Sequence, residues 1–255
     1  MKIFSLNAWH GTRELELREL LTAELASMDI FCFQEADGEL IQQIFHDIFP
    51  SDEFHKLYAN KLSGSYPDAL ASFVRKDIDL IDNTVLLENT GDSAGYSQVM
   101  HLREKNRDIF VANVHGAPYP GDKLDTPGRI LQSQTIIDHL SQCDGIRIAC
   151  GDFNLDPSTE SVRIFRQSNY LDLIRGYNIE TTRNDLAWRR FPGHEQKFAD
   201  YVFVSRDATI SNFTVPYSLA SDHLPLIVEL DISQTHLVVA GATEKLHARL
   251  ATTRR

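Results

Sequence analysis

The segment Gly151-Asp152-Phe153-Asn154 places a carboxylate two residues before an amide, directly after the apolar residues 146–150. Residues two apart on a strand share a face, so we expect Asp152 and Asn154 to project side by side beyond a strand's carboxyl end. The carboxylate can hold a cation or polarise water, and the amide can donate hydrogen bonds to a phosphoryl oxygen without adding negative charge. The pair suits phosphate chemistry, although aspartate and asparagine beside glycine, taken alone, favour a turn.

Polar residues also stand at the ends of other predicted strands. They are Asn7, Gln34-Glu35, His115, Asp200-Tyr201 and Ser221-Asp222-His223. Polar side chains gathered at strand ends are where α/β proteins build their sites. Each one alone also has a structural explanation, because asparagine and aspartate form turns and caps, and glutamate or histidine is common in solvent.

The hydrophobic pattern predicts the elements that position these residues. Residues 3–6 and 29–33 indicate strands, and residues 13–26 between them an amphipathic helix, which suits a parallel βαβ unit. A helix over residues 39–49 precedes a β-rich region, where sequential strands with short turns imply antiparallel pairing. The strands predicted there cover residues 55–60, 69–74, 80–87, 98–102 and 109–114.

The second half continues the mixture of helices and strands. A turn at Asp156-Pro157-Ser158 leads into a helix that begins at Ser158. The remaining predictions are a helix over residues 131–140 and strands over residues 146–150, 198–204, 209–213 and 226–230. So many apolar strand faces predict two sheets packed together with helices outside, in one domain over residues 1–231. Residues 232–255 are expected to form an appendage that could be partly disordered.

Composition limits the class of protein. The 255 residues are 42% hydrophobic and 9% aromatic, enough for one large core. Twenty-five Lys and Arg against 36 Asp and Glu give a net charge of −11, which argues against a dedicated nucleic-acid clamp. A phosphoesterase stays open, because clustered metal-binding acids make a protein acidic and bound cations reverse the sign locally.

The cysteines and the apolar runs indicate the compartment. Cys32, Cys143 and Cys150 have no CxxC spacing and cannot all pair, so neither a zinc site nor a disulfide framework is indicated. The first residues enter an apparent strand at once, and no run of about 18 apolar residues occurs. We expect no membrane span and a reducing, cytoplasmic setting.

Six segments, taken together and in order, resemble the endonuclease/exonuclease/phosphatase superfamily, whose members are DNase I-like. The resemblance covers residue 1 to about residue 231. The segments are Leu6-Asn7, Phe33-Gln34-Glu35, Asn113-Val114-His115, Gly151-Asp152-Phe153-Asn154, Ala199-Asp200-Tyr201-Val202-Phe203 and Ser221-Asp222-His223-Leu224-Pro225. This resemblance implies a four-layer α/β/β/α sandwich of two mixed, mainly antiparallel sheets, and divalent-metal-dependent hydrolysis of a phosphoester.

Carried over residue by residue, the resemblance implies a metal region and a catalytic region. Glu35 is the expected main metal ligand, with Asn7 beside it and Asp222 completing the region. Oxygen ligands suit Mg²⁺ (or Mn²⁺). Asp152 and Asn154 are expected to orient the attacking water and hold the phosphate. His223 is the expected general base, with Asp200 fixing its tautomer, although some mechanisms in this family give the base role to the residue at Asp152.

The segment from Val114 to Pro118 resembles DNase I-like and sphingomyelinase-like members, in which a histidine such as His115 can protonate the leaving oxygen. Asp68 stands where these members carry the acid that partners this histidine, although it could equally be a Pro-Asp turn residue. Trp188 and Arg189, followed by Arg190-Phe191, are candidates to stack on a base or grip a phosphate, or to pack as a structural pair.

Other features depart from the family or indicate structural roles. The strand at residues 72–75 lacks the usual Leu-Ser-Arg ending, and the long basic insertions of large nucleases are missing. Arg129 and Gln132 fit structural roles.

The leading prediction is therefore a Mg²⁺-dependent phosphodiesterase acting on nucleic acid or nucleotides, with no obligate protein partner evident. The alternatives are a phospholipid or small phosphomonoester hydrolase and, from a different class, a catalytically silent module that binds phosphate. Occupation of every chemical position by a competent residue disfavours the silent module.

Overall fold

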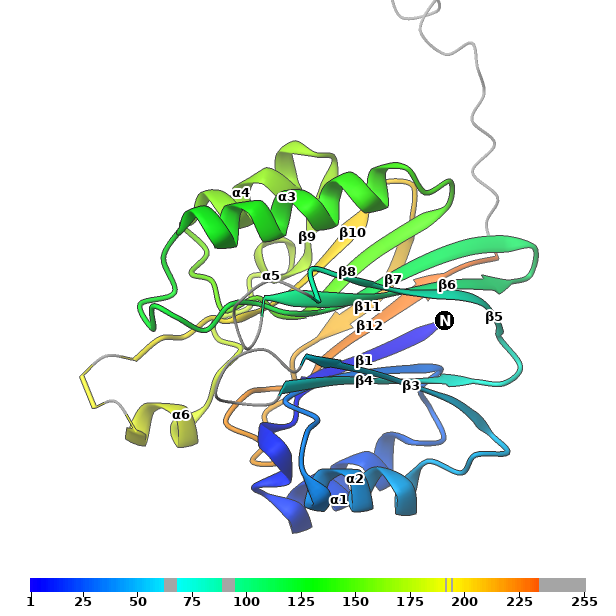
Figure 1. Cartoon of the computed structure of the whole chain (residues 1–255), viewed down its shortest axis with the longest axis horizontal. Helices are drawn as coiled ribbons and strands as arrows, with labels where there is room; N and C mark the ends of the chain where they lie inside the picture. Colours follow the sequence, from blue (N-terminus) through cyan, green and yellow to red (C-terminus); the bar gives the residue numbers. More distant parts are fainter. Residues whose placement is uncertain (62–67, 89–94, 191, 194, 234–255) are drawn as a thin grey trace, which may run out of the picture.

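Two six-stranded sheets lie face to face in the computed structural model of the chain, and helices cover their outer faces (Figure 1). The structure describes residues 1–61, 68–88, 95–190, 192–193 and 195–233. The predicted α/β/β/α sandwich with mixed, mainly antiparallel sheets is confirmed. Of the predicted C-terminal appendage, residues 234–255 lie outside the described residues.

The sheets combine strands from both halves of the chain. In spatial order, the first sheet consists of β11 (Thr209–Thr214), β12 (Leu226–Asp231), β1 (Lys2–Asn7), β2 (Ile30–Gln34), β4 (Asp68–Arg75) and β3 (Phe54–Lys61). The second sheet consists of β5 (Asp79–Leu86), β6 (Tyr96–Glu104), β7 (Arg107–His115), β8 (Ile146–Asp152), β10 (Asp200–Ser205) and β9 (Tyr170–Asp172).

Helices form the two outer layers. The helical elements are η1 (Trp9–Gly11), α1 (Glu14–Glu24), α2 (Glu39–Ile48), α3 (Pro127–Ser141), α4 (Glu160–Gln167), α5 (Leu173–Gly176) and α6 (Asp185–Arg190). Helices α1 and α2 cover the first sheet, whereas α3 and α4 cover the second (Figure 1). The short elements η1, β9, α5 and α6 were not predicted, because so few residues carry no readable hydrophobic period.

Local capping sets where the helices of the second layer begin. Helix α3 begins four residues before the predicted start, because the Thr126 hydroxyl accepts a hydrogen bond from the Arg129 N–H and Pro127 occupies the first turn. Helix α4 begins two residues after the predicted start at Ser158. The Asp156 carboxylate holds the Ser158 N–H in a turn at 2.9 Å, and Thr159 caps the helix instead.

Strand pairing brings the polar strand ends to one rim. In the parallel pair β1–β2, Asn7 lies opposite Gln34, and in the parallel pair β7–β8, His115 lies opposite Asp152. Parallel strands end together, so these polar residues collect at one edge of the sandwich. Strands β4 and β10 pair antiparallel with their neighbours, so their first residues are delivered to that same edge.

Each layer has its own core. Phenylalanines fill the space between the first sheet and its helices, and the rings of Phe49 and Phe73 stack with centroids 4.1 Å apart. A second, larger cluster joins the facing sheets and continues under α3 and α4. A buried polar network also crosses between the sheets: the Asn113 side chain donates to Ser72 Oγ at 3.0 Å and accepts from Gln34 Nε2 at 2.7 Å. Because every such bond has a specific direction, this network fixes how one sheet lies on the other.

Cys32, Cys143 and Cys150 are all free thiols. No helix in the described ranges is long and apolar enough to cross a membrane.

The close approach of Gly116 to the neighbouring backbone generates a stability prediction. A Cβ atom on Gly116 would lie 1.9 Å from the carbonyl oxygen of Phe153, whereas one on Gly121 in the same loop would meet nothing within 4 Å. We expect Gly116→Ala to lower the free energy of unfolding by about 3 kcal/mol or more, since backbone must move to admit the methyl group. Urea unfolding of Gly116→Ala beside Gly121→Ala measures this, and equal stability of the two variants would contradict it.

Candidate active site

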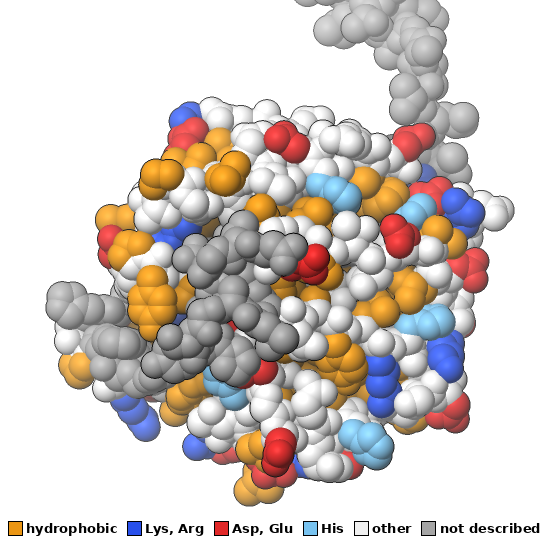
Figure 2. Space-filling view, in the orientation of Figure 1, with side chains coloured by type: hydrophobic (Ala, Val, Ile, Leu, Met, Phe, Trp, Pro, Cys, Tyr) orange, Lys and Arg blue, Asp and Glu red, His pale blue; other side chains and the backbone are white. Residues whose placement is uncertain are grey.

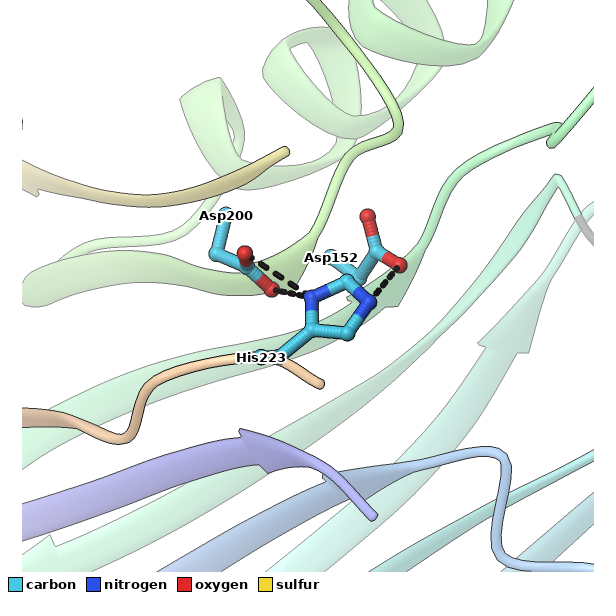
Figure 3. A group of neighbouring side chains, drawn as sticks. All are labelled: Asp152, Asp200 and His223. Atoms are coloured by element: carbon cyan, nitrogen blue, oxygen red, sulfur yellow. Dashed lines mark hydrogen bonds and ion pairs between the residues drawn. The ribbon is translucent and has the colours of Figure 1, made fainter. Parts of the chain in front are cut away.

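Two buried histidine–aspartate pairs approach one carboxylate at the rim of the sandwich. His223 Nε2 lies 3.6 Å from Asp152 Oδ2, and His115 Nε2 lies 3.9 Å from the same oxygen. Figure 3 shows the imidazole of His223 between Asp200 and Asp152. The rim residues expected from the sequence are linked by the contacts described below: Asn7, Glu35, Asp68, His115, Asp152, Asn154, Asp200, Asp222 and His223.

A turn after β8, not the face of a strand, relates Asp152 to Asn154. Strand β8 ends at Asp152, and Asn154 has a left-handed backbone with φ of 54°. The Asn154 N–H donates to Asp152 Oδ1 at 2.8 Å, as in an Asx turn. The expectation that strand alternation aligns the two side chains was therefore wrong, because the chain leaves the strand at Asp152 and turns.

The His223–Asp200 pair is fixed by several hydrogen bonds. His223 Nδ1 lies 2.8 Å from Asp200 Oδ1, and the Thr182 hydroxyl donates to Asp200 Oδ2 at 2.8 Å. Burial and the charge of Arg183 lower the pKa of His223, but the carboxylates around it outweigh both and raise the pKa above its usual value. Because Asp200 holds Nδ1, the His223 ring is fixed with Nε2 directed into the site.

The second pair is His115 with Asp68, the partner expected from the family resemblance. His115 Nδ1 lies 2.9 Å from Asp68 Oδ2, and both side chains are buried. Burial alone would lower the pKa of His115, but the charge and hydrogen bond of Asp68, with help from Asp152, raise it to about 10. His115 is therefore charged at neutral pH and can donate a proton.

Asp152 itself is buried yet ionised. Burial alone would raise its pKa, but the positive charges of His223, Lys123 and His115 outweigh burial and hold the pKa well below the usual value. Asn7 Nδ2 adds a hydrogen bond to Asp152 Oδ2 at 3.0 Å. A carboxylate with such a low pKa keeps its charge but is a weak proton acceptor.

Asn7 ends β1, and Glu35 directly follows the neighbouring strand β2 of the first sheet. Glu35 follows β2 in a left-handed conformation with φ of 49°, and its Oε1 accepts from Asn7 Nδ2 at 3.1 Å. The Asn7 Oδ1 atom accepts from the Trp9 N–H at 3.0 Å. Because a backbone N–H can only donate, this bond fixes the amide so that nitrogen faces Glu35 and Asp152.

Asp222 lies beside His223 and is paired with a cation. The guanidinium of Arg183 donates to Asp222 Oδ2 at 2.7 Å, and its Nε donates to the Asp222 carbonyl at 3.2 Å. Asp222 Oδ1 lies 3.9 Å from His223 Nε2. One Asp222 oxygen is therefore held by Arg183 while the other faces the histidine.

The donor set at the rim fits a hard divalent cation. Glu35 and Asp152 share Asn7 Nδ2 as a hydrogen-bond donor, so carboxylate oxygens from both sheets converge. The Glu35 side chain is 25% exposed, so an ion can reach it. Asp152, Asp200 and His223 also offer ligand atoms within 4.8 Å of one another. Sites with several carboxylate oxygens suit divalent cations of the Mg²⁺ type.

Two candidate substrate-binding residues are not joined to this cluster. Trp188 is half-buried and Arg189 is exposed, both on α6. Among the residues described, neither side chain has a hydrogen bond or ion pair to the site, and the Trp188 Nε1 atom is buried without a partner. Phe191 lies outside the described residues. A substrate-binding role for Trp188 and Arg189 stays a prediction.

Three site residues were missed by sequence analysis. Lys123 contacts Asn154, Arg183 contacts Asp222, and His10 Nε2 lies 3.2 Å from Glu35 Oε2. None of them ends a strand, and none lies in a stretch with a readable hydrophobic period. The Arg183 stretch, Glu180-Thr181-Thr182-Arg183, carries no signal beyond polarity.

The sequence matches a known protein family, and the fold matches solved structures. The sequence matches the Endonuclease/Exonuclease/phosphatase family over residues 4–223. The chain belongs to this family. Enzymes of the Endonuclease/Exonuclease/phosphatase family hydrolyse phosphate esters, so the rim described above is where such chemistry is expected. A comparison with curated protein sequences finds no match.

Several solved structures have the same fold as this chain, although their sequences are less than 20% identical to it. An endonuclease/exonuclease/phosphatase from Bacteroides vulgatus superposes with a TM-score of 0.73 at 15% identity, over 90% of this chain and 98% of that one. The mannosyl-6-phosphatase of Bacteroides thetaiotaomicron gives a TM-score of 0.73 at 16% identity, over 91% and 99%. The human Nocturnin catalytic domain, solved with a bound sulfate anion, gives a TM-score of 0.64 at 19% identity, over 91% and 93%.

The raised pKa of His115 gives a pH prediction for the metal-free protein. In the folded chain the pKa is about 10, whereas an unfolded histidine titrates near 6.5, so the stability due to this charge is complete below about pH 6.5 and is lost as pH rises toward 10. Asp68→Asn removes the main charge that raises the pKa. We expect NMR titration in EDTA to show a lower pKa of His115 in Asp68→Asn, and a shallower loss of stability over that pH range.

The control for this titration is Asp108→Asn, which removes the partner of His101 on the β6–β7 hairpin. That variant leaves the surroundings of His115 intact, so its His115 pKa is expected to match the wild type. An unchanged His115 pKa in Asp68→Asn would contradict the assignment of Asp68 as its partner.

Proposed function

We propose that this chain is a divalent-cation-dependent phosphodiesterase whose first substrate class is nucleic acid or nucleotides. The observation that supports this most is the pair of buried His–Asp dyads, with His223 and His115 directing Nε2 at one Asp152 oxygen. Hydrolysis needs a group that accepts a proton from water and a group that gives one to the leaving oxygen. Two histidines, each oriented by its own carboxylate, can divide these tasks.

The metal region would hold Mg²⁺ (or Mn²⁺) through Glu35, with Asn7 and Asp222 completing it. When bound, this ion would supply Lewis-acid stabilisation of negative charge on the phosphoryl oxygens. Asn7 presents nitrogen toward Glu35 in the structure, so an Asn7 ligand bond requires its amide to rotate away from the Trp9 N–H. As it stands, Asn7 holds Glu35 and Asp152 together through hydrogen bonds.

His223 is the general base in this proposal, and Asp152 is not. The pKa of Asp152 lies well below its usual value, which makes Asp152 a poor acceptor of a proton from water. His223 accepts that proton in its neutral form, which the positive charge of a bound cation would favour, and Asp200 stabilises the imidazolium that then forms. Asp152 then orients the attacking water and the two histidines.

His115 is the proposed general acid. It is charged at neutral pH because Asp68 raises its pKa, so it can protonate a leaving oxygen near Asp152. Asn154 lies at the same corner, and its amide can donate to a phosphoryl oxygen as charge develops there. The same groups could act on diesters or monoesters, because both expose a bridging oxygen and non-bridging oxygens.

Phosphomonoesters are the second candidate substrate class. Lys123 lies against Asn154 and would bring additional positive charge to the phosphate, which a dianionic monoester needs more than a diester does. The mannosyl-6-phosphatase with the same fold acts on such a phosphate by its name, so the architecture is compatible with this class. Phospholipid hydrolysis and a cytoplasmic setting stay predictions from the sequence.

The charge distribution on the surface gives little support for a binding site that spans a long stretch of nucleic acid. On the face shown in Figure 2, Lys and Arg side chains lie apart from one another among Asp and Glu side chains. With a net charge of −11, general attraction to a polyanion is weak. Short oligonucleotides and nucleotides are therefore preferred over long duplexes in the proposal.

The proposed function is tested by activity with and without metal. We expect the wild type to cleave phosphoesters with Mg²⁺ or Mn²⁺ and to lose activity in EDTA. Glu35→Ala and His223→Ala should each lower kcat by about 100-fold or more, since each removes a group from the reacting centre. The assay panel comprises plasmid DNA, single strands, RNA, nucleotides, sugar phosphates and lipid phosphodiesters.

A matched control for His223→Ala is His46→Ala, whose side chain is 81% exposed on α2. That variant should keep full activity, and thermal unfolding should show that all variants are folded. Normal turnover in Glu35→Ala or His223→Ala would contradict the site assignment, and phosphate binding without turnover on the whole panel would favour the silent binding module.

The role of His115 gives a separate prediction. If it protonates the leaving oxygen, His115→Ala should slow esters with a poor alkoxide leaving group by about 100-fold, but esters of an activated phenol by only about a few fold. Rates for a matched alkyl and nitrophenyl pair measure this. An equal loss on both esters would assign His115 a different role.

A further inference from the structure

Lys123 places a buried ammonium group at the phosphate corner of the site. Its side chain lies on the loop between β7 and α3, is 6% exposed, and donates from Nζ to Asn154 Oδ1 at 2.6 Å. No sequence motif indicates this residue, and the roles proposed above for acid, base and metal do not use it.

The charge of Lys123 has no carboxylate partner within ion-pair distance among the residues the structure describes. Burial lowers the pKa of Lys123 and the neighbouring charge of Arg183 lowers it too, while Asp152 opposes this effect. A buried ammonium that no carboxylate contacts directly is costly, so its surroundings favour an anion. Arg183 differs in this respect, because Asp222 already holds its guanidinium.

The loop around Lys123 is built to hold it. Arg129 is 1% exposed, and its guanidinium donates to the carbonyls of Ala117 at 3.0 Å and Pro120 at 2.5 Å. The Lys123 carbonyl accepts from the Asp156 N–H at 2.8 Å. Lys123 itself has a left-handed backbone with φ of 59°, which is unfavourable for lysine and persists only where the surroundings impose it.

Lys123 also determines which way the Asn154 amide faces. An ammonium can only donate and a carbonyl can only accept, so Lys123 fixes Oδ1 on its side and the Gly116 carbonyl fixes Nδ2 at 3.0 Å. One N–H of Asn154 is then left for a phosphoryl oxygen. Nζ has two further N–H groups at the same place, and neither has a partner in the described part of the chain.

We propose that Lys123 contacts a non-bridging oxygen of the substrate phosphate and gives this site phosphomonoesterase activity. A monoester carries up to two negative charges on its phosphoryl group where a diester carries one, so a nearby ammonium attracts it more strongly. Lys123 is then a residue that determines specificity within the active site. This inference rests on the proposed function, which supplies the hydrolysis itself.

The test compares one monoester with one diester of the same leaving group, nitrophenyl phosphate and bis-nitrophenyl phosphate, with Mg²⁺. We expect the wild type to hydrolyse both. Lys123→Met should lower kcat/KM for the monoester by about 100-fold, and for the diester by only about 10-fold, through the lost orientation of Asn154. Lys123→Arg should recover most of the monoester activity, and Lys76→Met, which removes an exposed lysine, should change neither rate.

A double-mutant cycle with Asn154→Ala distinguishes direct contact of Lys123 with phosphate from a role in which Lys123 only positions Asn154. If Lys123 acted only by orienting Asn154, Lys123→Met would have no further effect in the Asn154→Ala background. Direct contact predicts a further loss of about 10-fold on the monoester there. Calorimetric titration of the Mg²⁺-loaded protein with inorganic phosphate gives a readout without turnover, and Lys123→Met should weaken that binding by about 10-fold.

The outcomes distinguish this inference from the proposed function. A wild type that cleaves the diester but not the monoester overturns the inference alone, as does an equal loss on both esters or unchanged phosphate binding in Lys123→Met. If the wild type cleaves neither ester nor any member of the wider panel, the proposed function fails. The phosphate titration then still decides whether Lys123 contacts phosphate, and unfolding curves show whether each variant is folded.

Discussion

The charge of one buried carboxylate, Asp152, constrains the whole rim. An ionised carboxylate with 2% exposure is stable only if donors and cations surround it. Asn7 from the first sheet donates to it, and the Asn154 N–H donates from its own turn. His115, His223 and Lys123 supply positive charge from other segments. Both sheets and several loops must therefore meet at one point for the fold to tolerate this residue.

The same compensation produces the chemical asymmetry of the site. The cations that stabilise Asp152 depress its pKa, while the partner carboxylates Asp68 and Asp200 raise the pKa of their histidines. The two imidazoles lie 3.6 and 3.9 Å from Asp152 Oδ2, yet their pKa values and that of Asp152 are shifted in opposite directions. A site for proton transfer requires such a difference. Two glycines allow the backbone segments that carry His115 and Asp152 to lie close together. Gly116 and Gly151 let the loop after β7 and the end of β8 approach more closely than any side chain would permit.

Most of the architecture is predictable from the sequence, because the hydrophobic period and the turn residues are local signals. The parallel pairing of β1 with β2, the antiparallel β-rich region and the four layers were predicted and are confirmed. Helices α3 and α4 begin at other residues than predicted, because capping by Thr126 and Thr159 outweighs the apolar pattern. Short elements such as α6 and β9 were missed, since a few residues cannot show a period.

The order of residues along the chain specifies which chemical groups are available: carboxylates, amides and histidines at successive strand ends. How these groups meet depends on the folded chain. It turned Asn154 into a left-handed conformation, directed the Asn7 nitrogen toward Glu35, paired Arg183 with Asp222 and buried Lys123 beside Asn154. Those features depend on contacts between segments far apart in sequence, and burial sets their electrostatics. Local patterns carry no information on either.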